Sequence, residues 1–134
     1  MKGNHCKTFI FLAMASFSFS ASSFADENKK PEEVQAGVQI ETGKKLFNNS
    51  CKHCHAITYE DSVIGAPGLR SVLERHDEAW LNEWLKSPET FAQNDVVARD
   101  LIDANPFGLA MPTLPIMQDE ANRKAIIEYL KTLK

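Results

Sequence analysis

The chain has 134 residues, with 15 basic and 18 acidic side chains and a formal net charge of −3 at pH 7. This length is enough for one domain but not for two. The acidic balance argues against binding of nucleic acid and against adhesion to an anionic membrane surface.

The first segment has the parts of a secretory signal peptide. A short basic start precedes an apolar run over residues 9–19, and Ser23 and Ala25 are small residues at the cleavage-determining positions. We expect cleavage after residues 1–25, which would remove Cys6, take the net charge to about −5 and place the chain in the periplasm. The apolar run is too short to span a bilayer, and no later segment reaches that length, so stable membrane insertion is not expected.

Residues 26–41 are mostly polar or charged and show no clear period, which predicts a flexible N-terminal tail. From Thr42 the pattern turns helical, with Leu46 and Phe47 facing inward. Thr42 can act as the N-cap of this helix. The folded domain is therefore expected to span residues 42–134.

Residues 51–55 read Cys-Lys-His-Cys-His, the Cys-x-x-Cys-His pattern that attaches a c-type haem. Cys51 and Cys54 are three residues apart, so on one helical turn both thiols point to the same side and can reach two vinyl groups of one porphyrin. His55 follows at once and can bind the iron as the proximal ligand. The pattern predicts one covalently attached haem c.

Three other uses of the two cysteines are possible. A redox dithiol is typical of a βαβ context, and nothing before Cys51 indicates a strand. A structural zinc site would have to recruit a further ligand such as His53 or His76. A disulfide between Cys51 and Cys54 would close a very short loop with little gain in entropy.

The rest of the chain predicts helices separated by long loops. Residues 56–75 contain Gly65, Pro67 and Gly68, which are typical of a loop that wraps around something. Helices are expected over residues 77–85, 95–102 and 119–133, the first with four apolar residues on one face: Trp80, Leu81, Trp84 and Leu85. No segment alternates with a period of two, so the domain is expected to be all-α. Its core would be thin without a buried haem.

Three side chains are candidates for a second ligand to the iron: Met111, Met117 and His76. Met111 is favoured, because it stands in a stretch without helical period and is followed by Pro112, so that an extended loop can present its thioether to a metal. Met117 directly precedes the last helix, where methionine is more often a core residue.

From Thr42 to Leu133 the chain resembles a small soluble class I (mitochondrial-type) c-type cytochrome of bacterial periplasmic kind. The resemblance rests on the haem motif and on weaker motifs in the same order: Gly43-x-x-x-Phe47, Pro67-x-Leu69, Trp84-Leu85-Lys86-Ser87-Pro88, Met111-Pro112 and Tyr129-Leu130. The chain departs from the family in residues 89–107, an insertion that we expect to form a lid or a partner surface.

The resemblance implies a cytochrome c-like fold, with three to five helices and long loops wrapped around one covalently bound haem. It implies that the first and last helices cross where Gly43 and Phe47 meet Tyr129 and Leu130, since glycine permits close approach of two backbones. It also implies that the Nδ1 proton of His55 is donated to the carbonyl of Pro67, which orients the imidazole.

We therefore expect a periplasmic electron carrier, not an enzyme, with His55 and Met111 as iron ligands and redox proteins as donor and acceptor. Lys44, Lys45 and Lys52 either form a docking patch or are ordinary solvated lysines.

Two alternative functions remain. One is a haem domain with a labile sixth ligand that acts as a small-gas sensor or weak peroxidase. The other is a cytochrome subunit docked on a larger oxidoreductase.

Overall fold

The computed structural model describes residues 31–134, in which six α-helices occur and no β-strand. The all-α prediction is confirmed, but this part of the chain has six α-helices and not the three to five expected, because α2 and α4 are four-residue helices. The elements in order are α1 (Pro31–Leu46), the π-helical turn η1 (Phe47–Cys51), α2 (Val72–Arg75), α3 (Glu78–Lys86), α4 (Pro88–Phe91), α5 (Val96–Asp103), the 3₁₀ turn η2 (Pro115–Gln118) and α6 (Glu120–Leu130). None of the helices in this part of the chain is long and apolar enough to cross a membrane.

Helix α1 begins at Pro31 and not at Thr42, so the prediction of a flexible tail is wrong for residues 31–41. Glu32 and Glu33 lie in the first turn, where carboxylates interact favourably with the helix dipole. Thr42 does not cap the helix but donates from Oγ1 to the carbonyl of Val38 within it, at 2.8 Å. The signal peptide predicted for residues 1–25 and the rest of the predicted tail lie outside the described residues.

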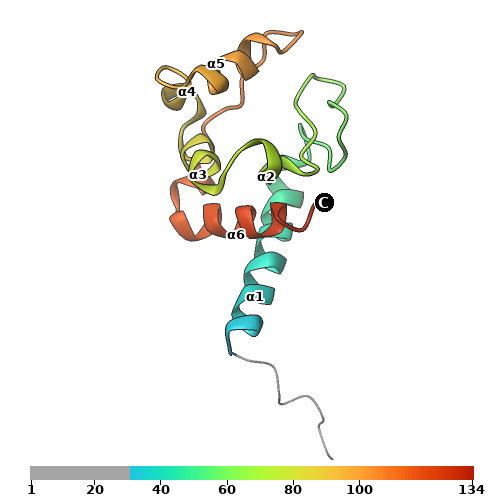
Figure 1. Cartoon of the computed structure of the whole chain (residues 1–134), viewed down its shortest axis with the longest axis vertical. Coiled ribbons are helices and arrows are strands. Elements are labelled where there is room, and N and C mark those ends of the chain that lie inside the picture. The colour runs from blue at the N-terminus through green and yellow to red at the C-terminus, as the bar shows by residue number, and fades with distance from the viewer. Residues whose placement is uncertain (1–30) are drawn as a thin grey trace, which may run out of the picture.

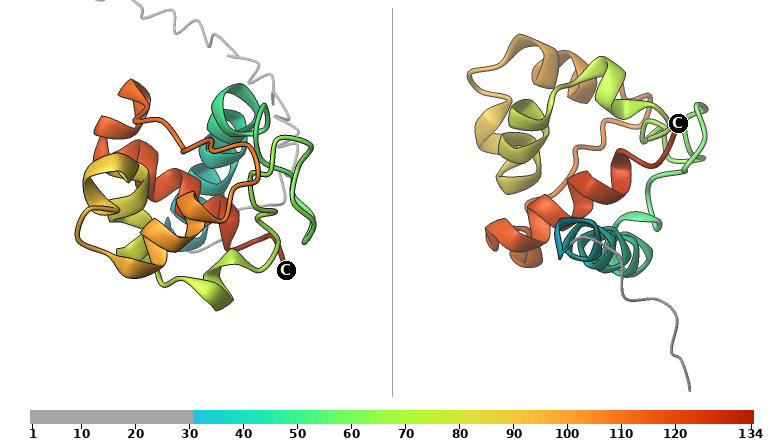
Figure 2. Two further views of the ribbon diagram at one scale, coloured as in Figure 1. Left: turned by 90° about the horizontal axis from the view of Figure 1, so that it is seen from above. Right: turned by 60° about the horizontal axis from the view of Figure 1, so that its bottom comes forward.

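The crossing of α1 and α6 forms the packed base of the domain (Figure 2). A Cβ built on Gly43 would overlap the carbonyl of Ala125 and come within 2.8 Å of the Tyr129 Cβ. Next to this point the rings of Phe47 and Tyr129 pack with their centroids 5.4 Å apart. The predicted contact of the first and last helices is confirmed, and only glycine permits it at position 43.

Helix α3 follows the prediction closely. The side chain of Asp77 caps it by accepting a hydrogen bond from the Trp80 amide at 2.8 Å. Leu81 and Leu85 are buried in the core, and the rings of Trp80 and Trp84 stack beside them. Helix α3 therefore presents one apolar face inward.

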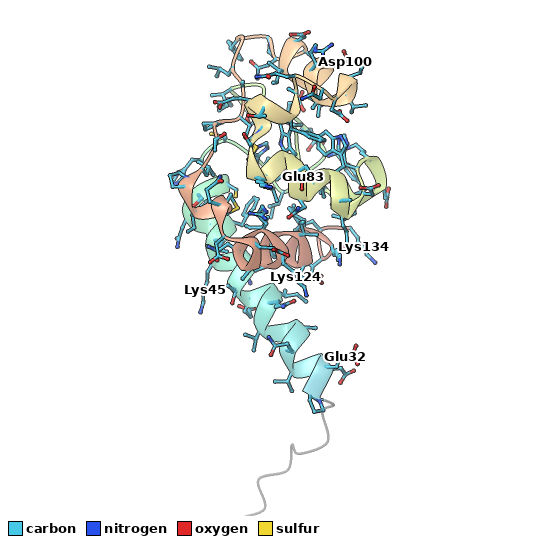
Figure 3. The ribbon with its side chains drawn as sticks, turned by 90° about the vertical axis from the view of Figure 1, so that its left-hand side faces the viewer. Glu32, Lys45, Glu83, Asp100, Lys124 and Lys134 are labelled. Carbon is cyan, nitrogen blue, oxygen red and sulfur yellow. The ribbon has the colours of Figure 1, made fainter. Side chains whose placement is uncertain are left out.

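The insertion folds into α4 and α5, which lie at the end of the molecule away from the free end of α1 (Figure 1). Figure 3 shows the same separation between Glu32 on α1 and Asp100 on α5. The carboxylate of Asp95 caps α5 through the Ala98 amide at 2.8 Å and also accepts from Trp80 Nε1 at 3.2 Å. This one side chain joins α5 to α3.

Arg123 on α6 is buried, and its hydrogen bonds join the packed base to η2 and to α3. Its guanidinium donates to the carbonyls of Met117 and Gln118 in η2, at 2.7 and 3.0 Å. Its Nε donates to Asn82 on α3 at 2.8 Å. These bonds fix the end of the loop between α5 and α6 against the packed helices.

Candidate functional site

A largely apolar cavity of about 240 Å³ lies between the helices and the long loops. Its walls come from η1, from residues 64–69, from α3 and α5, and from residues 109–114. Among its lining residues are Cys51, Cys54, His55 and Met111. Helices and loops from distant parts of the sequence thus line the same cavity.

The Cys-x-x-Cys-His turn delivers three of these side chains from one place in the chain. After η1 the backbone closes a tight turn in which the amides of Cys54 and His55 both donate to the carbonyl of Cys51, at 3.1 and 2.9 Å. Neither cysteine is in a disulfide. Burial, with a smaller contribution from the neighbouring Cys54, raises the pKa of Cys51 to about 11. Before haem is attached, the Cys51 side chain is therefore a neutral thiol at the cavity wall.

The imidazole of His55 has a fixed orientation. Its Nδ1 lies 2.8 Å from the carbonyl oxygen of Pro67, which can only accept, so Nδ1 carries the proton. Burial lowers the pKa of His55, and the bond to Pro67 opposes this shift only in part. A neutral ring with a proton on Nδ1 has a free lone pair on Nε2, as a metal ligand requires.

The loop that carries Pro67 is itself pinned. The amides of Leu69 and Arg70 donate to the carbonyls of Ala56 and Thr58, both at 3.0 Å. The guanidinium of Arg75 donates to the carbonyl of Gly68 at 2.6 Å. On the other side of Pro67, the carbonyl of Ala66 accepts from the Ser62 amide at 2.9 Å. Because the backbone on either side of Pro67 is held, its carbonyl is a stable support for the imidazole.

The three candidates for a second iron ligand have different surroundings. Met111 is half-buried and lines the cavity with His55. Met117 is fully buried at 0% exposure and belongs to the core cluster instead. His76 lines the cavity but stacks flat on Trp80, with ring centroids 4.0 Å apart. The structure therefore brings Met111, and not Met117, to the same cavity as His55.

The alternatives to haem find no support in residues 31–134. No group of three or more His, Cys, Asp or Glu side chains in that range is placed to hold a metal ion. The two cysteines of the motif form no disulfide, and the βαβ context of a thioredoxin-like protein is missing from this range. A large apolar cavity with two thiols, an imidazole and a thioether on its walls fits a haem, whose apolar ring and soft iron suit those groups.

Two residues that shape the site were not predicted from the sequence. Arg75 supports the loop of Pro67, as described above. Asn105 lies at the cavity wall, where its side chain accepts from the amides of Phe107 and Leu109, at 2.9 and 3.1 Å, and donates to the carbonyl of Ile64 at 3.1 Å. An Asn-Pro dipeptide is typical of a turn, but it carries no sign of a bond to a loop 41 residues away.

Comparison with known proteins gives a consistent result. A family model for cytochrome c matches residues 40–134. Among solved structures, cytochrome c from Rhodothermus marinus is similar, with a TM-score of 0.63 and 27% identity, covering 72% of this chain and 78% of that one. An engineered cytochrome c from the same organism, bound to a carbene intermediate, is similar at a TM-score of 0.59 with the same identity and coverage. No match was found among curated proteins.

Proposed function

Because the chain belongs to the cytochrome c family and carries covalently bound haem c, we propose that it is a periplasmic one-electron carrier with His55 and Met111 as the iron ligands. One observation carries this proposal: the haem-attachment turn and Met111, distant in sequence, line the same apolar cavity. Bound haem c supplies a one-electron Fe(II)/Fe(III) couple.

In this proposal Cys51 and Cys54 anchor the cofactor. Each thiol would add across one vinyl group, so that the S–H hydrogen and the sulfur would both be retained in the product and no external oxidant would be needed. The burial that keeps Cys51 a neutral thiol is compatible with this role. Two anchors on one turn fix the ring relative to His55.

His55 is positioned for one orientation only. The bond from Nδ1 to the Pro67 carbonyl holds the ring plane and increases the donor strength of Nε2. Because hydrogen bonds on both sides of Pro67 hold the loop, we expect this orientation to be the same in both oxidation states.

Met111 and the apolar walls of the cavity determine in which direction the reduction potential of the haem is shifted. A thioether is a soft neutral donor that favours Fe(II), and apolar walls disfavour the additional positive charge of Fe(III). Both effects raise the potential, so the protein is expected to act toward the oxidising end of a respiratory chain. With His55 and Met111 both bound to it, the iron would have no open position for a substrate.

The assignment of the ligand is tested with the purified holoprotein and a matched pair of variants. Met111→Ala is expected to lower the reduction potential and to allow carbon monoxide to bind the reduced protein. Met117→Ala is expected to lose stability, since Met117 is fully buried in the core, but to keep the potential and to remain closed to the gas. Carbon monoxide binding by the unmodified protein would instead favour a sensor or peroxidase.

Export is tested separately, by mass spectrometry of the protein recovered from the periplasm. The proposal predicts a chain that begins at Asp26 and carries one haem. A haem-free full-length chain in the cytoplasm would contradict it.

A further inference from the structure

Two loops meet at one side of the cavity. Gly65, at a positive φ of 71°, lies so close to the other loop that a Cβ there would come within 2.7 Å of the Pro106 ring. The side chain of Asn105 donates to the carbonyl of Ile64 at 3.1 Å. Both loops also line the cavity, through residues 64–67 and 109–112. They form a continuous rim beside the site proposed for the haem.

The rim is free of charge. Residues 62–69 and residues 105–118 contain no Asp, Glu, Lys, Arg or His, although 25% of the chain is charged. The two uncharged stretches are distant in sequence but joined in space at Gly65 and Pro106.

Large apolar side chains on the rim point into solvent. Val63 is 94% exposed, Phe107 63% and Leu109 49%. The backbone that carries the last two is well ordered by Asn105, whose side chain accepts from both of their amides. An exposed apolar patch on a fixed backbone, next to a functional site, is typical of an interaction surface.

The charges next to the rim in the sequence are mostly acidic. Glu60 and Asp61 precede the first uncharged stretch, and Asp103 lies two residues before Asn105. The basic Arg75 reaches the first loop, but its guanidinium is engaged with the carbonyl of Gly68 at 2.6 Å. Arg70, which follows the first stretch, is engaged elsewhere: it donates to the carbonyl of Lys134 at 2.9 Å and lies over the ring of Tyr59.

Two of the three lysines considered as a docking patch, Lys44 and Lys45, lie away from the rim. Lys44 and Lys45 are in the last turn of α1, and Figure 3 shows Lys45 well away from Asp100 on α5. They belong to the packed base of the molecule and not to the two loops of the rim.

We propose that Val63, Phe107 and Leu109, which we call the apolar rim, dock a redox partner protein whose own face is apolar at its centre and basic at its edge. This inference rests on the electron-carrier function proposed above. Apolar contact next to the cavity excludes water and brings the partner close to the cofactor, while the acidic border attracts it from a distance. Such a surface is small, so the complex is short-lived.

The test uses a second copy of the chain as the probe, through electron exchange between oxidised and reduced holoprotein followed by NMR. Two rims meet in this reaction, and one electron passes from the ferrous to the ferric copy with no net change. The double variant Val63→Asp, Phe107→Asp is expected to exchange at least ten times more slowly. The control, Val34→Asp, Val38→Asp, adds the same charge to exposed positions of α1 and is expected to exchange as the wild type does.

A second measurement addresses the basic border of the partner. Isotope-labelled reduced wild type is mixed with the oxidised Asp61→Lys, Asp103→Lys variant. Electron transfer to this basic copy is expected to be faster than wild-type self-exchange at low ionic strength, and the difference in rate should vanish at high salt.

The absorption spectrum and reduction potential of each variant serve as checks that the fold is intact. A variant with serine at positions 63 and 107 tests the loss of apolar surface without added charge.

The outcomes separate the two proposals. A wild type that undergoes no reversible one-electron exchange contradicts the carrier function, and the docking inference with it. A wild type that exchanges rapidly, with rim and α1 variants that slow it equally or not at all, overturns the docking inference alone.

Discussion

The base of the domain and the rim of its cavity are built in different ways. At the base, α1 and α6 touch backbone to backbone at Gly43, and buried side chains such as Phe47 and Ile126 fill the space beside the contact. At the rim, two loops without regular structure are held by single polar side chains such as Asn105, and their apolar residues face solvent. Packing therefore supplies the stability of the domain, while individual hydrogen bonds position the loops that carry function.

The largest effect is expected at the base. Gly43→Ala places a Cβ against the Ala125 carbonyl and forces α1 away from α6, which should lower the free energy of unfolding by about 3 kcal/mol or prevent folding. Gly37→Ala is the matched control on the same helix, since nothing lies within 4 Å of a Cβ there. Denaturant unfolding of the two holoproteins measures the difference. Equal stability of the two variants would mean that the crossing is not closely packed.

A smaller loss is expected where the base holds the end of the functional loop. Arg123→Ala leaves the buried carbonyl of Met117 without its partner and should lower the free energy of unfolding by about 2 kcal/mol. Lys124→Ala, at the exposed neighbour labelled in Figure 3, should change it by less than about 0.5 kcal/mol. Chemical denaturation followed by circular dichroism tests the pair. If Arg123→Ala lowers the free energy of unfolding no more than Lys124→Ala does, the hydrogen bonds of Arg123 do not stabilise this loop.

At the rim we expect a small loss of stability and a larger increase in the access of small ligands to the cavity. Asn105→Ala removes the bonds to Phe107, Leu109 and Ile64, and we expect it to lower the free energy of unfolding by about 1 kcal/mol. Because the loop leads to Met111, binding of added imidazole to the oxidised protein should accelerate several-fold. Asn105→Asp keeps the two acceptor bonds but not the donor to Ile64, and should fall between alanine and wild type. Imidazole binding unchanged in Asn105→Ala would show that the loop is held by other contacts.

The smallest expected effect is on the pH dependence of the free energy of unfolding, through His76. Burial, and to a lesser degree Arg75, lowers the pKa of His76, against the opposing effect of Asp95 and Asp77. The unfolded chain, with an ordinary pKa near 6.5, therefore binds a proton more readily than the folded one. The free energy of unfolding should be constant above about pH 6.5 and should fall as the pH drops below it. His76→Gln should make this fall shallower, as thermal melts across that range would show; an unchanged slope would exclude His76 as its source.

The sequence was informative where structure follows a local pattern. Helices α3, α5 and α6 each begin after an aspartate whose carboxylate accepts from a backbone amide: Asp77, Asp95 and Asp119. The apolar spacing of α3 located its buried face. The Cys-x-x-Cys-His motif located one wall of the cavity, since attachment of haem requires that spacing.

Features without a local pattern could not be predicted. The first half of α1 is mostly exposed and has too few apolar residues to show a helical period, so its sequence predicts a tail. The turns α2 and α4 are four residues each, too short for a helical period to show. The supports at Arg75 and Asn105 act on backbone carbonyls far along the chain, and any sequence supplies such carbonyls, so nothing in the composition marks them.

The most direct test of the proposed function is the absorption spectrum of the oxidised wild-type holoprotein beside that of Met111→Ala. The proposal predicts a low-spin spectrum with a thioether-to-ferric-iron band in the wild type, and loss of that band in the variant. A high-spin wild type without the band, or a band that persists in Met111→Ala, would contradict the assignment of His55 and Met111 as the ligand pair.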